Sequence, residues 1–195
     1  DINNPHNLSG KLSALKKLKP NVRYIGLLSR LRKMETLIKY NLLVLLSGPE
    51  PQRSILEKIL LQQLIGFDKK VLFIRGVFTE EKLDVRNDNV TIANHLLISK
   101  LELAINESEM VLARSGYSTI MDLATLSKKA FFIPTPGQDE QLYLAKRLKE
   151  LQIAPYANQN EFKLKMLLEG VNYKGFTNYN VGDFPQELFN LFNSK

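Results

Sequence analysis

The sequence predicts an α/β fold, a Rossmann-like parallel sheet flanked by helices, and two observations lead to this prediction. Short runs of continuously apolar residues recur along the chain, as expected for strands that are covered on both faces. Longer segments with helical spacing of apolar residues separate these runs, which is the pattern of a parallel sheet with crossover helices. The five expected strands are Asn41–Leu46, Val71–Arg75, Asn89–Ala93, Glu109–Ala113 and Ala130–Pro134.

Helices are expected between and after these strands. From Ile55 to Leu64, apolar residues recur three and four positions apart, and Gly66 provides a stop signal. Similar stripes occur at Ile98–Asn106, Ile120–Leu126 and Leu144–Leu151. Residues 181–195 predict an amphipathic helix that packs either on this domain or on a partner domain, and the sequence leaves both open. Its apolar stripe comprises Phe184, Leu188, Phe189, Leu191 and Phe192.

The length, cysteine content and hydropathy of the chain limit the class of protein. Its 195 residues suffice for one full domain with its own core, expected at residues 24–180. The absence of cysteine excludes disulfides and thiolate chemistry, which agrees with an expected cytoplasmic location. The longest purely apolar run, Leu42–Leu46, is far shorter than the roughly 20 residues of a membrane-spanning helix. The chain begins at Asp1 without a methionine, so residues 1–23 are expected to be an interdomain connector that follows a missing N-terminal domain.

The positive charge is concentrated near the N-terminus. The net charge is +7, and residues 1–40 hold nine Lys and Arg against two Asp and Glu, whereas the rest carries 18 of each sign. This segment is either a patch for anionic lipid or nucleic acid or a solvated connector. We favour the connector, because the segment lacks interleaved aromatic residues and nucleic-acid-binding motifs. No nucleic-acid partner is therefore expected, and peripheral contact with a membrane stays open. The basic residues concerned are Lys11, Lys16, Lys17, Lys19, Arg30, Arg32 and Lys33.

The loop after the fourth expected strand has the features of a diphosphate site. In the segment Arg114–Ala124, RSGYSTIMDLA, Gly116 lies at a strand-to-helix turn, and Ser118 and Thr119 lie at a helix start. A helix N-terminus offers unpaired N–H groups and the positive end of the helix dipole, and glycine permits close approach of a ligand. Asp122, one turn into the helix, is then placed to accept hydrogen bonds from a ribose diol. Thr119 and Asp122 also match a capping box, and the spacing alone does not distinguish the two interpretations.

The loop after the fifth expected strand is rich in hydrogen-bonding side chains. In the segment Ile133–Gln141, IPTPGQDEQ, the side chains of Gln138, Asp139 and Gln141 can together bind the hydroxyls of a sugar. Taken alone, the loop is a polar turn with Asp139 as the N-cap of the next helix. Because two such loops follow adjacent strands, a ligand site at this edge of the sheet is favoured.

Other candidate sites give weaker signals. The segment Ser47–Arg53, SGPEPQR, resembles a phosphate-binding turn only loosely, because Pro49 and Pro51 remove two backbone donors. The two histidines, His6 and His95, are distant in sequence and unaccompanied, so no zinc site is expected. No nucleophile with a base partner is recognisable, and no catalytic residue is assigned within the chain.

Taken together, RSGYSTIMDLA and IPTPGQDEQLYLAKRL resemble the C-terminal domain of glycosyltransferase family 28, and the resemblance extends from about Leu42 to Leu151. It implies a two-domain GT-B enzyme in which residues 24–180 bind a UDP-sugar. The missing N-terminal domain then holds the acceptor and the catalytic base. The resemblance further implies inverting transfer without a metal or a cofactor, with the UDP-sugar as donor substrate. N-acetylglucosaminyl transfer to a cell-envelope glycan, at the inner face of the membrane, is one candidate activity.

The resemblance also assigns roles to individual positions. The expected substrate-binding residues are Gly48 in the first loop, Leu97 and Ile98 at the uracil, Arg114, Ser115, Gly116 and Thr119 at the diphosphate, Asp122 at the ribose, and Gln138, Asp139 and Gln141 at the sugar. Three departures from the family pattern leave the donor sugar open. Glu50 would repel a phosphate placed at the first loop, while Asp122 and Leu142 stand where the family usually has Glu and Gln.

Two other functions remain open on the residues alone. A sugar-nucleotide epimerase or hydrolase of the same fold would share the nucleotide loops but would need an acid or base that the sequence does not reveal. A non-catalytic nucleotide-binding or nucleic-acid-binding module would use the basic N-terminal segment. A comparison of how the chain binds UDP and how it binds DNA separates these classes.

Overall fold

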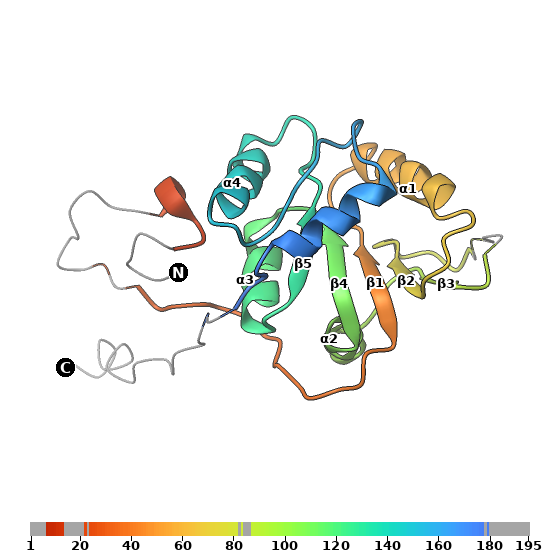
Figure 1. Ribbon diagram of the computed structural model, residues 1–195, viewed down its shortest axis with the longest axis horizontal. Coiled ribbons are helices and arrows are strands. Elements are labelled where there is room, and N and C mark those ends of the chain that lie inside the picture. The colour runs from red at the N-terminus through yellow and green to blue at the C-terminus, as the bar shows by residue number, and fades with distance from the viewer. Residues whose placement is uncertain are drawn as a thin grey trace.

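The computed structural model describes residues 7–13, 22, 24–81, 83, 87–177 and 179. Its centre is a five-stranded sheet in which all neighbours are parallel and the order is β3-β2-β1-β4-β5 (Figure 1). The chain runs outward from β1 to β3 on one side, then crosses back to β4 and β5 on the other. The strands are β1 (Tyr40–Leu45), β2 (Val71–Ile74), β3 (Val90–Ala93), β4 (Ser108–Ala113) and β5 (Lys129–Phe132).

Helices cover both faces of the sheet. Helices α2 (Ile98–Asn106), α3 (Tyr117–Thr125) and α4 (Asp139–Glu150) contribute to one apolar core. Helix α1 (Gln52–Gln63) and the 3-10 helix η2 (Leu164–Asn172) contribute to the other. Successive residues of β1 point into opposite cores, as the period of a strand requires. The predicted α/β fold class is therefore confirmed.

The expected elements form with small shifts at their ends. Every expected strand is present, and β5 ends at Phe132, two residues before the predicted Pro134. Helix α3 begins at Tyr117, three residues before the apolar stripe, because its first turn is polar and the stripe marks only the buried side. Gly66 follows α1 with a φ of +76°, a left-handed conformation that suits the predicted stop.

Part of the expected connector packs against the domain. Residues Gly10–Leu12 form a 3-10 helix, η1, and Leu8 is fully buried in the core of α2, α3 and α4. Arg147 Nη2 of α4 donates to the Asn7 carbonyl at 2.6 Å, and Tyr143 Oη accepts from the Lys11 amide at 2.7 Å. The contacts of the domain thus extend beyond the boundary predicted at residue 23. The expected tail helix at 181–195 and residues 1–6, 14–21 and 23 of the expected connector lie outside the described residues. Within the described ranges, no helix has both the length and the apolar character required to cross a membrane.

Candidate functional site

The candidate site lies at the carboxyl edge of the sheet, where the strand order reverses between β1 and β4. In doubly wound sheets such a reversal leaves a crevice outside the strand ends, and ligands bind there. The structure brings the predicted loops together at this edge. The Arg114 side chain from the loop after β4 bonds to the Gln52 carbonyl after β1, at 2.9 Å. Ser115 Oγ donates to the Gln141 carbonyl in the first turn of α4, at 2.8 Å.

The N-terminus of α3 is open. Gly116 is the N-cap, no side chain caps the helix, and its first turn carries no acidic residue. The backbone at Gly116 has φ −68° and ψ 144°, which any residue adopts. A Cβ added there would meet nothing closer than Thr119 Oγ1 at 3.9 Å. Neither the backbone nor the packing of the described residues therefore requires a glycine at position 116. The absence of a side chain at Gly116 leaves the N-terminus of α3 accessible.

The capping-box interpretation of Thr119 and Asp122 is wrong. An N-cap must precede the first helical residue, whereas Thr119 is the third residue of α3. Thr119 instead lies partly exposed beside Gly116, at the end of the helix where a diphosphate is expected. The structure thus removes the capping box as an explanation of these two residues without testing a ligand-binding role.

Asp122 contacts the segment that leads into β1. Its Oδ1 accepts a hydrogen bond of 2.6 Å from Ser29 Oγ, 93 residues away, and Ser29 Oγ also accepts from the Leu31 amide at 3.0 Å. Burial raises the pKa of the half-buried Asp122 above its ordinary value, while the Ser29 hydroxyl and the Arg30 charge oppose this rise. Among the described residues nothing donates to the second carboxylate oxygen, Oδ2, so it is available to a ligand.

Arg114 is buried beneath the crevice and binds protein groups. Only 2% of the residue is exposed, and its Nη atoms donate to four neutral acceptors. These are the carbonyls of Ile133 at 3.1 Å, Pro134 at 3.2 Å and Gln52 at 2.9 Å, and Gln159 Oε1 at 2.6 Å. Burial lowers the pKa of Arg114 to about 10, and Nε has no partner among the described residues. Its guanidinium thus joins the loop after β4 to the start of α1, the end of β5 and the segment at Gln159. All four acceptors are neutral, so none of them compensates the positive charge.

The polar turn before α4 is held by its own side chains. Gln141 Oε1 accepts from the Thr135 amide at 2.9 Å, and Gln141 Nε2 donates to Gln138 Oε1 at 2.5 Å. The N-cap of α4 is Gln138, so the prediction of Asp139 as N-cap is wrong by one residue. Asp139 is the first residue of the helix and is exposed, where its charge interacts favourably with the helix dipole.

The N-terminus of α1 is filled by a carboxylate of the chain. Glu50 Oε2 accepts from the Ser54 amide at 3.1 Å and from Ser54 Oγ at 2.6 Å, and Glu50 Oε1 accepts from Arg53 Nε at 2.6 Å. This places an acid where a phosphate-binding loop would place its ligand. Gly48, with φ +104°, remains exposed at the start of the same loop. The weak phosphate signal predicted for this loop agrees with the geometry.

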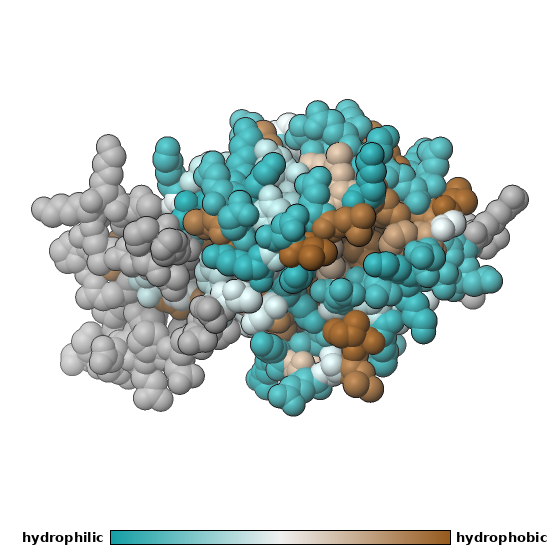
Figure 2. Space-filling view, viewed as in Figure 1, coloured by the Kyte–Doolittle hydropathy of each residue, from teal (hydrophilic) through white to brown (hydrophobic). Residues whose placement is uncertain are grey.

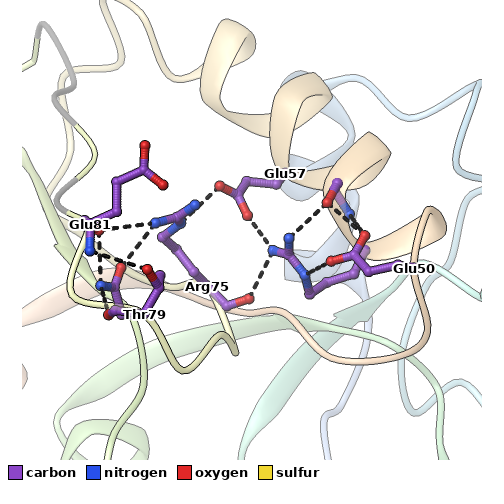
Figure 3. A network of polar contacts seen from close by, with 8 residues as sticks. Glu50, Glu57, Arg75, Thr79 and Glu81 are labelled. Carbon is purple, nitrogen blue, oxygen red and sulfur yellow. Dashed lines mark hydrogen bonds and ion pairs between the residues drawn. The ribbon is translucent and has the colours of Figure 1, made fainter.

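A buried charge network continues from α1 to the loops after β2 and β3 (Figure 3). Glu57 lies between two arginines and accepts from Arg53 Nη1 and, at 2.8 Å, from Arg75 Nε. Arg75 Nη1 in turn donates to Asn94 Oδ1 at 3.0 Å. Asn94 Nδ2 donates to the carbonyls of Thr79 and Glu81, at 2.6 Å and 3.0 Å. This network positions the chain that enters α2.

The positions predicted to bind uracil lie at the start of α2. Leu97 is the N-cap of α2, and it and Ile98 are 71% and 47% exposed. No acidic residue lies in the first turn of α2. Both residues are therefore exposed just after β3, and their contact with a uracil stays a prediction.

Sequence reasoning missed several groups of this edge. Thr135 is 3% exposed, and its Oγ1 has no partner among the described residues. The segment Asn158–Glu161 lies beside the turn that precedes α4 and lines the same cavity as Thr135. Its only sequence signal is a run of amides and an acid, ANQNE from Ala157, which matches no motif. Within the part of the chain that the structure describes, no cluster of three His, Cys, Asp or Glu residues is arranged to hold a metal.

Comparison with known proteins identifies the family of this arrangement. The profile of the glycosyltransferase family 28 C-terminal domain matches residues 47–177, which is more than half of the chain. The chain is 25% identical over 135 residues to a UDP-N-acetylglucosamine--N-acetylmuramyl-(pentapeptide) pyrophosphoryl-undecaprenol N-acetylglucosamine transferase of Buchnera aphidicola subsp. Acyrthosiphon pisum, in strains Tuc7 and APS. The match covers 66% of this chain and 38% of each relative, so the chain spans less than half the length of these enzymes.

Solved structures show the same fold. The chain resembles MurG of Acinetobacter baumannii with a TM-score of 0.55 and 17% identity, over 83% of this chain and 51% of that one. It resembles the glycotransferase of kitacinnamycin with a TM-score of 0.54 and 14% identity, over 75% and 38% of the two chains. At these identities the likeness concerns the fold, which is that of one domain of a GT-B glycosyltransferase.

Proposed function

The chain belongs to the C-terminal domain of glycosyltransferase family 28, and from this premise we propose that it is the donor-binding half of a UDP-sugar-dependent glycosyltransferase. Its relatives in Buchnera aphidicola carry N-acetylglucosamine transferase names, and UDP-N-acetylglucosamine is therefore the first donor to test. The acceptor and its binding surface belong to a further N-terminal domain. A cell-envelope glycan is the proposed acceptor class, at the cytoplasmic face of the membrane.

The observation that carries this proposal is the open N-terminus of α3 at the strand-order reversal. Its first amide groups have no intrahelical acceptor, the dipole is positive there, and Gly116 leaves the approach free. The N-termini of the neighbouring helices α1 and α4 carry acidic side chains instead. Glu50 occupies the N-terminus of α1, and Asp139 and Glu140 lie in the first turn of α4. A diphosphate is therefore best accommodated at α3.

The remaining parts of the donor follow from that placement. The free Oδ2 of Asp122, one turn further along α3, accepts from a ribose hydroxyl, and the backbone at Leu97 and Ile98 contacts the uracil. Arg114 does not touch the diphosphate in this arrangement. Its buried charge lies beneath the loops and attracts an anion through a low-dielectric region, where electrostatic interactions are strongest.

The proposed reaction is an inverting displacement at the anomeric carbon. The leaving UDP gains negative charge as the glycosidic bond breaks, and preorganised N–H groups at α3 stabilise that charge without a metal ion. The acceptor hydroxyl loses its proton to a general base, which the N-terminal domain supplies.

A nucleotide titration tests the proposal. The 195-residue chain is titrated with UDP, GDP, dTDP and inorganic pyrophosphate by calorimetry, with thermal unfolding recorded in parallel. UDP is expected to bind and to raise the melting temperature by mass action, and GDP is expected to bind at least about tenfold more weakly. Equal binding of all four ligands, or binding of DNA at physiological salt in place of UDP, contradicts the proposal.

A further inference from the structure

An apolar groove of about 410 Å³ lies at the amino edge of the sheet, opposite the crevice of the candidate site. The first residues of β1 and β4 form its floor, and η2 and the loop that leads into β2 form its walls. Its apolar lining includes Leu42, Phe67, Met110 and Leu167. Figure 2 shows apolar surface gathered along η2 on this face. An exposed apolar patch that is rimmed by polar residues marks an interaction site.

The wall that η2 contributes carries a ridge of exposed apolar side chains. Side chains three residues apart lie in line on a 3-10 helix, so Lys165, Leu168 and Val171 form one row. Leu168 and Val171 are 68% and 72% exposed. The preceding row faces the sheet, because Gly170 is buried and a Cβ there would lie 2.5 Å from Met110 Cε. Close packing of that row on β4 therefore turns the ridge of Leu168 and Val171 outward.

Hydrogen bonds hold η2 in place at both of its ends. Before η2, the Leu164 amide donates to Gln63 Oε1 at 2.7 Å, and Gln63 Nε2 donates to the Phe162 carbonyl at 3.1 Å. After η2, the Lys174 amide donates to the Gln152 carbonyl at 3.1 Å. A surface that is already ordered loses little conformational entropy when it binds a partner. The ridge is thus preorganised for a contact.

The charges of the groove are balanced. Its lining carries the cations of Lys69 and Lys165 and the carboxylates of Asp68 and Glu109. None of the four forms an ion pair within the part of the chain that the structure describes. An anionic membrane or a nucleic acid selects a surface with an excess of cations, and this lining has no excess. A contact between two identical surfaces instead needs both signs on one patch, because the cations of each copy meet the acids of the other.

We propose that the η2 groove and its ridge form a two-fold interface with a second copy of this chain. Groove and ridge lie side by side on one surface, so a two-fold axis between them brings the ridge of each copy to the groove of the other. The interface goes beyond the proposed function and does not depend on it. It lies at the amino edge of the sheet, and the crevice at the carboxyl edge therefore stays open in the dimer.

Analytical ultracentrifugation of the 195-residue chain tests the interface, at concentrations from about 1 to about 300 μM, where weak and stable dimers are distinguished. The wild type is expected to show a reversible monomer–dimer equilibrium. Leu168→Asp and Val171→Asp are each expected to weaken the dimer at least about tenfold, because each places a charge in an apolar contact. Leu12→Asp is the matched control, since Leu12 is also an exposed apolar residue but lies on η1. It is expected to dimerise as the wild type does.

A pair of charge variants tests whether the partner is an identical surface. The acidic variant carries Lys69→Glu and Lys165→Glu, and the basic variant carries Asp68→Lys and Glu109→Lys. Each is expected to lose self-association, because like charges then face one another across the two-fold axis. An equimolar mixture is expected to form the mixed dimer, which also shows that both variants are folded.

Four outcomes overturn the proposal. The first is a wild type that stays monomeric over the whole concentration range, and the second is a dimer that persists in both ridge variants or is not restored in the mixture. The third is a monomeric wild type that sediments with vesicles containing phosphatidylglycerol, which assigns the face to a lipid surface. The fourth is dimerisation only after removal of residues 181–195, which assigns the groove to that segment of the chain.

Discussion

Ser29 and Asp122 are joined by a hydrogen bond of 2.6 Å between the Ser29 hydroxyl and one oxygen of the Asp122 carboxylate. The contact ties the segment before β1 to the helix that offers its N-terminus to the crevice. It orients the carboxylate and leaves its second oxygen free of protein donors among the described residues. The same side chain thus has a structural partner and a proposed ribose partner, and substitutions distinguish the two roles.

Asp122→Asn is expected to weaken UDP binding by about 1–3 kcal/mol, the range for a hydrogen bond to a charged group. Asparagine keeps an oxygen that accepts from Ser29, so the fold is expected to remain intact. Ser29→Ala is the control, because it removes the structural partner and leaves the carboxylate. It is expected to cost stability of about 1 kcal/mol without weakening UDP. Equal UDP affinity of the wild type and Asp122→Asn contradicts the ribose role.

The pH dependence of stability reports the burial of the same carboxylate. Burial raises the pKa of Asp122, so the folded state keeps this proton to a higher pH than the unfolded state. The stabilising contribution of the protonated group is complete below the unfolded pKa of about 4 and is lost as pH rises through the folded pKa. The free energy of unfolding of the wild type, relative to that of Asp122→Asn, is therefore expected to fall as the pH rises through that window. Urea unfolding of both proteins from pH 3.5 to 7 measures this relative free energy. A difference in unfolding free energy that stays constant with pH contradicts the burial effect.

Gly116→Ala is expected to weaken UDP binding by about 1.5–3 kcal/mol, since a methyl group at the helix N-terminus obstructs a charge-assisted hydrogen bond. The fold tolerates the change, because the backbone angles are ordinary and the nearest described atom is 3.9 Å away. The N-cap preference costs at most about 1 kcal/mol of stability. Gly116→Val is expected to weaken UDP further. Unchanged affinity in both variants places the diphosphate elsewhere.

Glu57→Gln is expected to destabilise the domain by about 3–5 kcal/mol, because it leaves two buried arginines without their shared carboxylate. The side chains of Arg53, Glu57 and Arg75 are each less than a tenth exposed. Glu150→Gln, an exposed glutamate at the end of α4, serves as the control and is expected to change stability by less than about 0.5 kcal/mol. Chemical denaturation measures the free energy of unfolding of both variants. A loss of stability in Glu57→Gln as small as that in Glu150→Gln contradicts the role of the network.

The chain alone is expected to bind UDP and to transfer no sugar. Neither histidine lies in the two candidate ligand loops, and the match covers only 38% of the length of the Buchnera relatives. Loss of the general base alone removes about 10²–10⁴-fold of rate. Release of UDP from UDP-N-acetylglucosamine, in the presence of a cell-envelope lipid extract, is compared between the chain and a full-length member of the family. Comparable turnover would show that the catalytic groups lie within these residues.

The sequence by itself determined the elements and the edge of the sheet that carries the candidate site. Continuous apolar runs and helical stripes are local patterns, so five strands and the flanking helices followed from them. The Arg114–Asp122 loop was likewise recognisable, because a glycine before a helix start is a local signal. The turn residues before α4 predicted its N-cap to within one residue: Asp139 was expected and Gln138 is observed.

The tertiary structure decided which way the polar side chains of that edge point. Arg114 turns inward to Gln159, 45 residues away, and Asp122 meets Ser29 across 93 residues. The Thr135 hydroxyl has no partner among the described residues and is buried between the loop after β1 and the segment at Asn158. Each outcome depends on burial by residues that are distant in sequence, and a desolvated polar group takes whichever partner the fold brings near. A local pattern contains no information about those neighbours, so only the folded chain distinguishes the residues that hold the site together from those that are free to bind.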